Sequence, residues 1–164
     1  MKSIFKTLGF AALACILTGC PYTSSVPIDE PNVKVDKKLI GKWVKTDDLT
    51  ADNPSYYEIE SHDKFLYKIT DNSYNSMDST YSREMYISHV TDIDGTTFMN
   101  MQKDGTGDYY LHRVVLKDKV LTFIEVTENI DEQFDTSAEL KAFIAKYMHL
   151  SFFYSKEEVE YTKQ

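Results

Sequence analysis

The sequence predicts a mainly β protein, built as an antiparallel meander or barrel with one C-terminal α-helix and a final strand. Three observations predict this class. Short runs rich in branched and aromatic residues follow one another from residue 39 onward. Polar turn residues separate these runs at even spacing. One amphipathic helical pattern occurs, and it lies near the C-terminus.

The expected strands are short and joined by tight turns. Asp94-Gly95 and Lys117-Asp118-Lys119 have the composition of hairpin turns. The segment between Thr70 and Thr80 is polar throughout, and we expect it to form a longer loop. The predicted strands span residues 39–46, 55–60, 64–70, 81–90, 96–102, 108–116 and 119–126.

The helix begins with a capping-box pattern, in which Thr136 is the expected N-cap and Glu139 reaches back to it. Apolar residues then recur with helical spacing, which indicates a face that packs on the β-structure. Residues 150–161 are rich in β-formers again, and we expect them to add edge strands. The apolar stripe consists of Leu140, Phe143, Ile144, Tyr147 and Met148.

The N-terminus has the order of a secretory signal peptide: a basic start, an apolar run from Leu8 to Leu17 and a short cleavage region. The run is about half as long as the ~20 residues that a membrane-spanning helix needs. Leu17-Thr18-Gly19-Cys20 resembles the lipobox of bacterial lipoproteins. The resemblance implies that residues 1–19 are removed and that Cys20 becomes the lipid-bearing first residue of the mature protein.

Composition restricts the possible partners. Removal of Lys2 and Lys6 with the signal leaves 16 basic and 26 acidic residues, a formal charge of −10. Nucleic acid is therefore an unsuitable partner, and membrane attachment should depend on the lipid. Cys15 leaves with the signal, so Cys20 is the single cysteine of the mature chain and no internal disulfide can form.

Residues 20–36 contain three of the four prolines and little hydrophobic periodicity. We expect a flexible, lipid-anchored tether that reaches about 50 Å when extended, followed by one domain over residues 37–164. An acidic run directly after the lipidated cysteine resembles the surface-export signal of some lipoproteins, and Pro21–Ser25 stands in its place here. This favours an outer-membrane lipoprotein that faces the periplasm, with surface exposure as the alternative.

The only tryptophan of the chain, Trp43, stands in Gly41-Lys42-Trp43 at the start of the first predicted strand. Followed by a meander, one helix and a final strand, this resembles the lipocalin and wider calycin pattern, in which Gly-x-Trp opens the barrel. Lipocalins usually stack a basic residue of the last barrel strand on the tryptophan. Strand 119–126 offers none, and Arg113 lies one strand earlier, so a filled barrel or an open sheet capped by the helix stays an alternative.

A closed barrel of about eight strands either fills with side chains or holds one small ligand. The leading hypothesis is a binding module at the cell envelope for a small apolar ligand, an amphipathic ligand or a protein partner. The alternative is a structural or accessory envelope lipoprotein with a filled barrel. The residues expected to line a cavity lie on strands 81–90, 96–102 and 108–116, and they are Met85, Met99, Met101, Tyr109 and Leu111.

We expect no enzymatic activity and no cofactor or metal. Asp92–Thr96 resembles the Asp-x-Asp-Gly-Thr motif of haloacid-dehalogenase-type phosphatases, but that motif needs an α/β fold and Asp-Gly between two strands predicts a hairpin. The four histidines lie on different predicted elements without metal-ligand spacing. Asp78-Ser79-Thr80 resembles a short O-glycosylation motif that some bacteria use on exported proteins.

Overall fold

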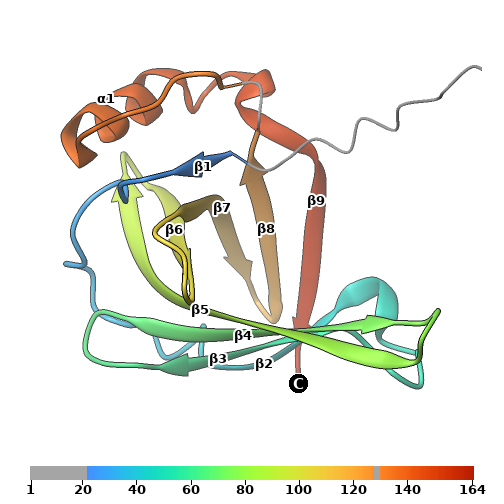
Figure 1. The fold of residues 1–164 in the computed structure, drawn as a ribbon. Helices are drawn as coiled ribbons and strands as arrows, with labels where there is room; N and C mark the ends of the chain where they lie inside the picture. Colours follow the sequence, from blue (N-terminus) through green and yellow to red (C-terminus); the bar gives the residue numbers. More distant parts are fainter. Residues whose placement is uncertain (1–21, 128–129) are drawn as a thin grey trace, which may run out of the picture.

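The computed structural model describes residues 22–127 and 130–164. Eight antiparallel strands form a closed barrel, because β9 pairs with both β8 and β2. Figure 1 shows β2, β3 and β4 as a lower layer from which β5 bends upward to join the other strands. The barrel strands are β2 (Gly41–Lys45), β3 (Tyr56–Ser61), β4 (Tyr67–Asn75), β5 (Thr80–Ile93), β6 (Thr96–Lys103), β7 (Tyr109–Lys117), β8 (Val120–Val126) and β9 (Tyr154–Lys163).

The predicted mainly β class, with one C-terminal helix and a final strand, is confirmed. The hairpin turns lie where their composition indicates. Asp94 and Gly95 both have positive φ, 50° and 80°, between the paired residues Ile93 and Thr96. Asp118 also has a positive φ of 55° in the turn between β7 and β8.

The long polar loop expected between Thr70 and Thr80 is wrong. β4 continues to Asn75, β5 begins at Thr80, and these two residues pair across a short turn. The pairing of β4 with β3 ends at Asn72, and β5 joins β6 only from Tyr86. The tip of this hairpin therefore extends beyond its neighbours, where polar side chains meet water and their polarity is compatible with strand structure.

Alternate side chains of the strands form two separate cores. Residues that point into the barrel form the first core, which includes Trp43, Ile59, Ile69, Met99 and Leu121. Residues on the outer side of β5 to β8 form the second core with the helix and the N-terminal segment. This second core includes Ile28, Phe98, Leu111, Leu140 and Ile144.

The helix α1 (Ser137–Tyr147) packs on the outside of the barrel, as its apolar stripe predicts. Thr136 is its N-cap: the Glu139 backbone N–H donates to Thr136 Oγ1 at 3.3 Å, and Thr136 Oγ1 donates to Glu139 Oε2 at 2.8 Å. A 3-10 turn, η2 (Ser151–Phe153), leads from the helix region into β9. Residues 150–161 form one strand rather than several: residues 154–160 pair with β8 alone, as an edge does, and Tyr161–Lys163 also pair with β2 and so close the barrel.

The flexible tether expected over residues 20–36 is wrong from Tyr22 onward. Tyr22 and Ile28 are buried in the second core, and β1 (Thr23–Ser24) pairs with β7. Val33 and Val35 then pack against the first core at one end of the barrel. Prolines and low periodicity here mark an irregular but packed segment, which we call the strap (residues 22–36). Residues 1–21, with the expected signal peptide and Cys20, lie outside the described residues.

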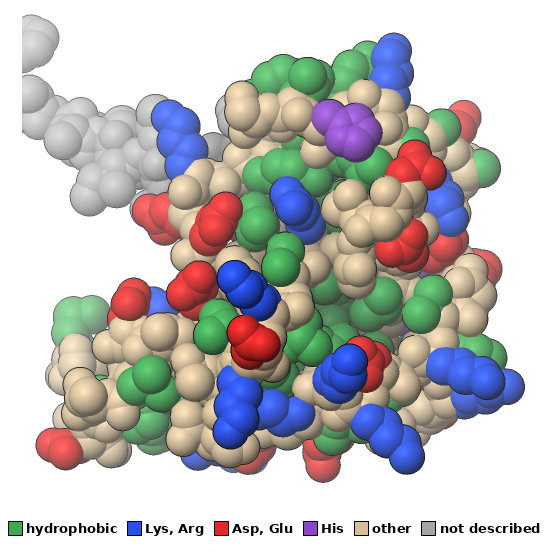
Figure 2. Space-filling view, turned by 180° about the vertical axis from the view of Figure 1, so that it is seen from behind, with side chains coloured by type: hydrophobic (Ala, Val, Ile, Leu, Met, Phe, Trp, Pro, Cys, Tyr) green, Lys and Arg blue, Asp and Glu red, His purple; other side chains and the backbone are tan. Residues whose placement is uncertain are grey.

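Charged side chains of both signs are interspersed over the molecular face in Figure 2, with hydrophobic side chains between them. A single-sign basic patch, the usual footprint of a nucleic-acid surface, is not visible on this face. Among the described residues, no helix is long and apolar enough to cross a membrane.

Candidate ligand-binding site

The first core fills most of the barrel interior. Trp43, Ile69, Met99 and Leu121 are completely buried in it, and Ile59 is nearly so. Space remains at two places on the interior side, in pockets of about 230 Å³ and about 220 Å³. Each is smaller than the roughly 300–1,000 Å³ typical of sites for drug-sized ligands. Each therefore suits only a small molecule.

The first of these spaces, which we call the tyrosine pocket, is surrounded by side chains from four strands. β3 supplies Tyr57, and β7 supplies His112. β8 and β9 complete the wall. The whole lining consists of Tyr57, His112, Phe123, Glu125, Ser155, Glu157, Val159 and Tyr161.

Three aromatic rings form one continuous wall of the tyrosine pocket. Tyr57 and Tyr161 stack with ring centroids 4.6 Å apart, and Phe123 meets both rings edge-on at 5.5 Å and 5.8 Å. Burial raises the pKa of Tyr161 to about 12 and raises that of Tyr57 well above its usual value. Both phenols are therefore neutral at physiological pH.

His112 is the unusual polar group of the tyrosine pocket. Its ring meets Phe123 edge-on at 5.8 Å. Its Nδ1 atom is buried and has no hydrogen-bond partner within the described part of the chain. Burial lowers the pKa of His112 to about 4, so the imidazole is neutral at pH 7. A buried polar atom without a partner costs about 1–3 kcal/mol, and a ligand that hydrogen-bonds to it would recover that cost.

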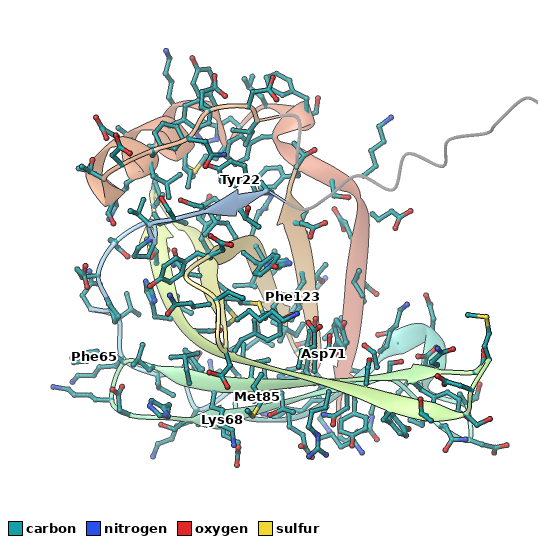
Figure 3. All side chains as sticks on the ribbon, in the orientation of Figure 1. Tyr22, Phe65, Lys68, Asp71, Met85 and Phe123 are labelled. Carbon is teal, nitrogen blue, oxygen red and sulfur yellow. The ribbon has the colours of Figure 1, made fainter. Side chains whose placement is uncertain are left out.

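Carboxylates give the pocket a negative character. Glu125 and Glu157 line it, and the lining contains no lysine or arginine. Asp71 of β4 lies close by: its charge raises the pKa of both Tyr57 and Tyr161, and Figure 3 shows it with Phe123 in the same part of the interior. Burial raises the pKa of Asp71 itself, against a hydrogen bond of 2.8 Å from Ser73 Oγ that lowers it.

Asp71 differs from the neighbouring carboxylate Glu84, which has a positively charged partner. Glu84 of β5 receives hydrogen bonds from Lys103 Nζ and from the Tyr86 hydroxyl, both at 2.7 Å. These bonds, with the Lys103 bond as the larger cause, lower the pKa of Glu84. Within the described part of the chain, Asp71 forms no ion pair with a lysine or arginine. The partly buried carboxyl group of Asp71 thus lacks a cationic partner from these residues.

The structure does not bring together the five residues predicted to line a cavity. Met99 and Met101 point into the barrel, where they belong to the packed first core. Tyr109 and Leu111 lie on the opposite side of β7, in contact with the second core under the helix. Met85 faces outward and is 42% exposed, as Figure 3 shows at the lower layer.

Sequence reasoning missed the tyrosine pocket because both faces of β7 are mixed. The face with Tyr110, His112 and Val114 points inward, and the face with Tyr109 and Leu111 points outward. Strand alternation gives two faces but does not say which one is inside. The tight turn at residues 118–119 is a signal that could have indicated the inward face. It pairs Lys117 with Val120 and so determines which β7 side chains lie on the same face as which β8 side chains.

The other space lies at the strap end of the interior. It is lined by ten residues of the strap, the adjoining loop and the barrel strands, including Val33, Leu39 and Tyr67. Two polar groups here have partners within the chain: Trp43 Nε1 donates to the carbonyl of the lining residue Leu39 at 2.7 Å, and the Asp36 backbone N–H donates to the Tyr67 hydroxyl at 2.6 Å. Both groups are therefore engaged by the protein itself.

A basic residue does stack on Trp43, and it comes from β9 rather than from strand 119–126. Lys163 of β9 pairs with Trp43 across the ladder, and its Nζ lies 5.2 Å from the indole centroid. The same Nζ donates to the Lys38 carbonyl at 2.6 Å. A side chain on Gly41 would meet Lys163 Cε at 3.0 Å. Arg113 instead lies over the Tyr154 ring, at 5.7 Å.

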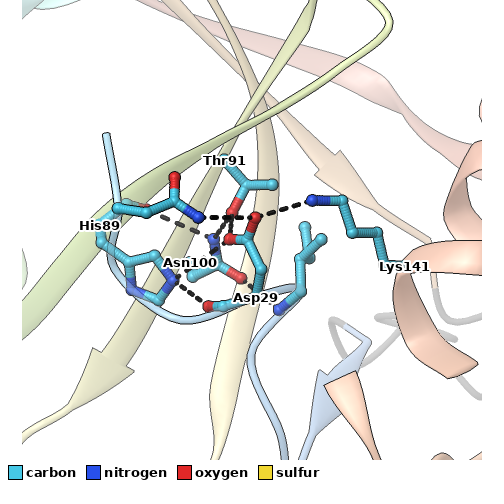
Figure 4. A network of polar contacts seen from close by, with 7 residues as sticks. Asp29, His89, Thr91, Asn100 and Lys141 are labelled. Atoms are coloured by element: carbon cyan, nitrogen blue, oxygen red, sulfur yellow. Dashed lines mark hydrogen bonds and ion pairs between the residues drawn. The ribbon is translucent and has the colours of Figure 1, made fainter. Parts of the chain in front are cut away.

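A buried polar network fastens the strap to the barrel wall and the helix (Figure 4). Asp29 accepts a hydrogen bond from Thr91 Oγ1 and an ion pair of 2.8 Å from Lys141 Nζ, and its carbonyl lies 2.7 Å from His89 Nε2. Asn100 Oδ1 accepts from the Ile28 backbone N–H at 2.7 Å. These polar atoms have partners within the chain, so the network acts as a clamp and leaves little for a substrate.

The remaining sequence motifs lie apart from the tyrosine pocket. Asp92 accepts the Gly95 N–H in the β5–β6 hairpin turn, which is not the end of a parallel strand that a phosphatase motif needs. Asp78, Ser79 and Thr80 are exposed at the tip of the β4–β5 hairpin. The described residues contain no group of three side chains placed to hold a metal ion.

Comparisons with protein-family models, with curated proteins and with solved structures find no match for this chain. The fold and the pocket therefore define its class by themselves: a small eight-stranded antiparallel barrel, filled at the centre, with a polar and aromatic pocket on its interior side.

Proposed function

We propose that this protein is a lipid-anchored binding module of the cell envelope that holds a small amphipathic ligand in the tyrosine pocket. The observation that carries the proposal is His112, a residue of the aromatic pocket lining whose buried Nδ1 has no hydrogen-bond partner from the described chain. Ligand sites typically combine apolar walls with a few well-placed polar groups. The aromatic wall and His112 form that combination.

The envelope location rests on the signal peptide and on the lipobox at Cys20. We propose an outer-membrane lipoprotein that faces the periplasm. The lipocalin-like reading of the domain gains support from Lys163, which supplies on Trp43 the basic residue that strand 119–126 lacks. No catalytic group enters this proposal, because binding requires only the pocket.

Native mass spectrometry of the mature protein, purified gently from its host envelope, tests the proposal. We expect a species heavier than the lipidated chain by the mass of one small molecule, and extraction would identify it. His112→Phe, which keeps a flat ring and removes Nδ1, should lose that mass. An empty wild-type protein that also takes up no added small molecule would contradict the proposal.

A second function is favoured by the packed centre of the barrel, where Trp43, Ile69 and Leu121 leave no continuous cavity. In that case the protein is an accessory envelope lipoprotein that works through its surface. The β4–β5 hairpin is the feature suited to such a role, because its tip residue Met77 is 92% exposed. Crosslinking from Met77→Cys in cells would test it, with Leu49→Cys as the control.

A further inference from the structure

We infer that the ligand of the tyrosine pocket is an organic cation: a small amine whose apolar body lies on the aromatic wall and whose ammonium group faces the carboxylates. This inference rests on the proposed function and specifies its ligand class. Four features of the described residues carry it: the aromatic wall, the carboxylates, the position of Asp71 and the neutral His112.

The aromatic wall favours a positive charge. The faces of tyrosine and phenylalanine rings carry negative electrostatic potential, so cations bind over them with about 0.5–2 kcal/mol of stabilisation, more when water is excluded. Tyr57, Phe123 and Tyr161 contribute three such rings to the pocket lining. Because burial keeps the two phenols neutral, the rings contribute as π-systems and as hydroxyl groups rather than as anions.

The charged groups favour the same sign. Glu125 and Glu157 lie in the lining, and Asp71 is near enough to perturb Tyr57 and Tyr161. An anionic ligand would place its charge against these carboxylates. A neutral ligand would leave the carboxyl group of Asp71 without a cationic partner. An ammonium group would supply that partner, as Lys103 does for Glu84 on the next strand.

His112 is a second group that can fix the position of the ammonium group. A neutral imidazole with its proton on Nε2 presents Nδ1 as a hydrogen-bond acceptor. An ammonium group has three donors and no acceptor, so one N–H can bind Nδ1 while the others bind carboxylate oxygens. A carboxylate ligand has only acceptors and cannot make the same set of contacts with the carboxyl groups of Glu157 and Asp71.

Volume limits the size of the amine. A pocket of about 230 Å³ accommodates one ring or a short chain with an amino group, and not a diacyl lipid. We therefore choose three probes that share the phenylethyl group and differ in charge: 2-phenylethylamine, 2-phenylethanol and 3-phenylpropionate. At pH 7 these are a cation, a neutral molecule and an anion.

The experiment is calorimetric titration of the mature lipidated protein in mild detergent with each probe. We expect the amine to bind at least about tenfold more tightly than the alcohol, and the anion to bind most weakly. Asp71→Asn and Glu157→Gln should each weaken amine binding by about fivefold or more and change alcohol binding little. Glu160→Gln, which removes the same charge on the outward face of β9, is the matched control and should bind the amine like the wild type.

Circular dichroism and the melting temperature of each variant show that a lost affinity is not a lost fold. Equal or tighter binding of the alcohol or the anion would overturn the cation inference and leave the ligand site in place. An equal loss of amine affinity in Glu160→Gln would overturn it as well, since only the overall charge would then matter. Failure of all three probes to bind would overturn both this inference and the proposed site.

Discussion

The two spaces on the barrel interior are nearly equal in volume, about 220 Å³ and about 230 Å³, and differ in how their polar groups are treated. At the strap end, the indole of Trp43 and the hydroxyl of Tyr67 find partners in the strap and the adjoining loop. At the tyrosine pocket, the described chain leaves His112 Nδ1 without a partner and partly buries the carboxyl group of Asp71 without an ion pair. Two spaces of nearly equal volume thus differ in their polar pairing: the protein itself pairs the polar groups at one end, and we propose that a ligand does so at the other.

The largest effect should come from the strap end. Trp43 is fully buried in the first core, so Trp43→Ala removes a large side chain and leaves a cavity. We expect a loss of about 3–5 kcal/mol in the free energy of unfolding, measured by urea denaturation with circular dichroism. Tyr57→Phe at the tyrosine pocket is the comparison and should cost about 1 kcal/mol or less. Similar losses for the two variants would show that the two ends do not differ as described.

The next effect is a pH dependence that belongs to the tyrosine pocket. Burial lowers the pKa of His112 from the ordinary 6.5 to about 4. Between these values the unfolded chain binds the proton and the folded chain does not, so stability should fall as the pH drops from about 6.5 towards 4. The full effect is at most about 3 kcal/mol.

Urea midpoints at a series of pH values, compared between the wild type and His112→Phe, measure this contribution. His89 of the strap network also has a pKa lowered by burial, so the variant should lose only part of the slope. An unchanged slope in His112→Phe would assign the whole dependence to other groups.

A smaller effect concerns the lysine at the strap end. Lys163 lies over Trp43 and donates to the Lys38 carbonyl at 2.6 Å. Lys163→Met keeps the chain length and removes the cation and the donor, so we expect a loss of about 1 kcal/mol in unfolding free energy. Lys119→Met in the β7–β8 turn is the control, with an expected change within about 0.5 kcal/mol. Equal changes in the two variants would remove the special role of Lys163.

The smallest expected effect on stability is a gain rather than a loss. Burial raises the pKa of Asp71, so its charged form costs stability at neutral pH. Asp71→Asn removes the charge, and we expect the melting temperature at pH 7 to rise by a few degrees, roughly the shift produced by 1 kcal/mol or less. At a pH below the pKa of the unfolded aspartate, both states carry a proton and the gain should vanish. A lower melting temperature at pH 7 would mean that the carboxylate stabilises the fold.

Local signals in the sequence identified much of the fold. The Asp94-Gly95 turn, the Thr136 cap and the apolar stripe of α1 depend on neighbouring residues only, and all three are found where predicted. The β4–β5 hairpin departs from the prediction because the polarity of residues 70–80 favours a loop when it is read from the sequence alone. A strand pair that extends beyond the sheet has water around it, so its polar sequence carries no information against strand structure.

The candidate site depends on long-range relations that composition does not reveal. The inward face of β7 is set by contacts with strands far away in sequence, such as the packing of Val114 in the first core. The sequence of the strap is typical of a tether, because Ile28 is one apolar residue among prolines and polar residues. Its burial depends on Asn100, which accepts the Ile28 N–H from a strand 72 residues further along the chain.

The packed strap also determines how freely the barrel can move at a surface. Tyr22 is buried, and its N–H donates to the Val126 carbonyl. Two peptide links separate Tyr22 from Cys20, which limits their Cα atoms to about 7.6 Å apart. A lipid on Cys20 would therefore hold the barrel directly against the bilayer, with little freedom to tumble. Thr127 and Phe153, joined by a backbone hydrogen bond beside Val126, mark this end of the molecule, and Phe152 there is 57% exposed. With such an anchor, this end of the molecule would stay close to the membrane surface, and any ligand of the tyrosine pocket would be exchanged near the lipid headgroups.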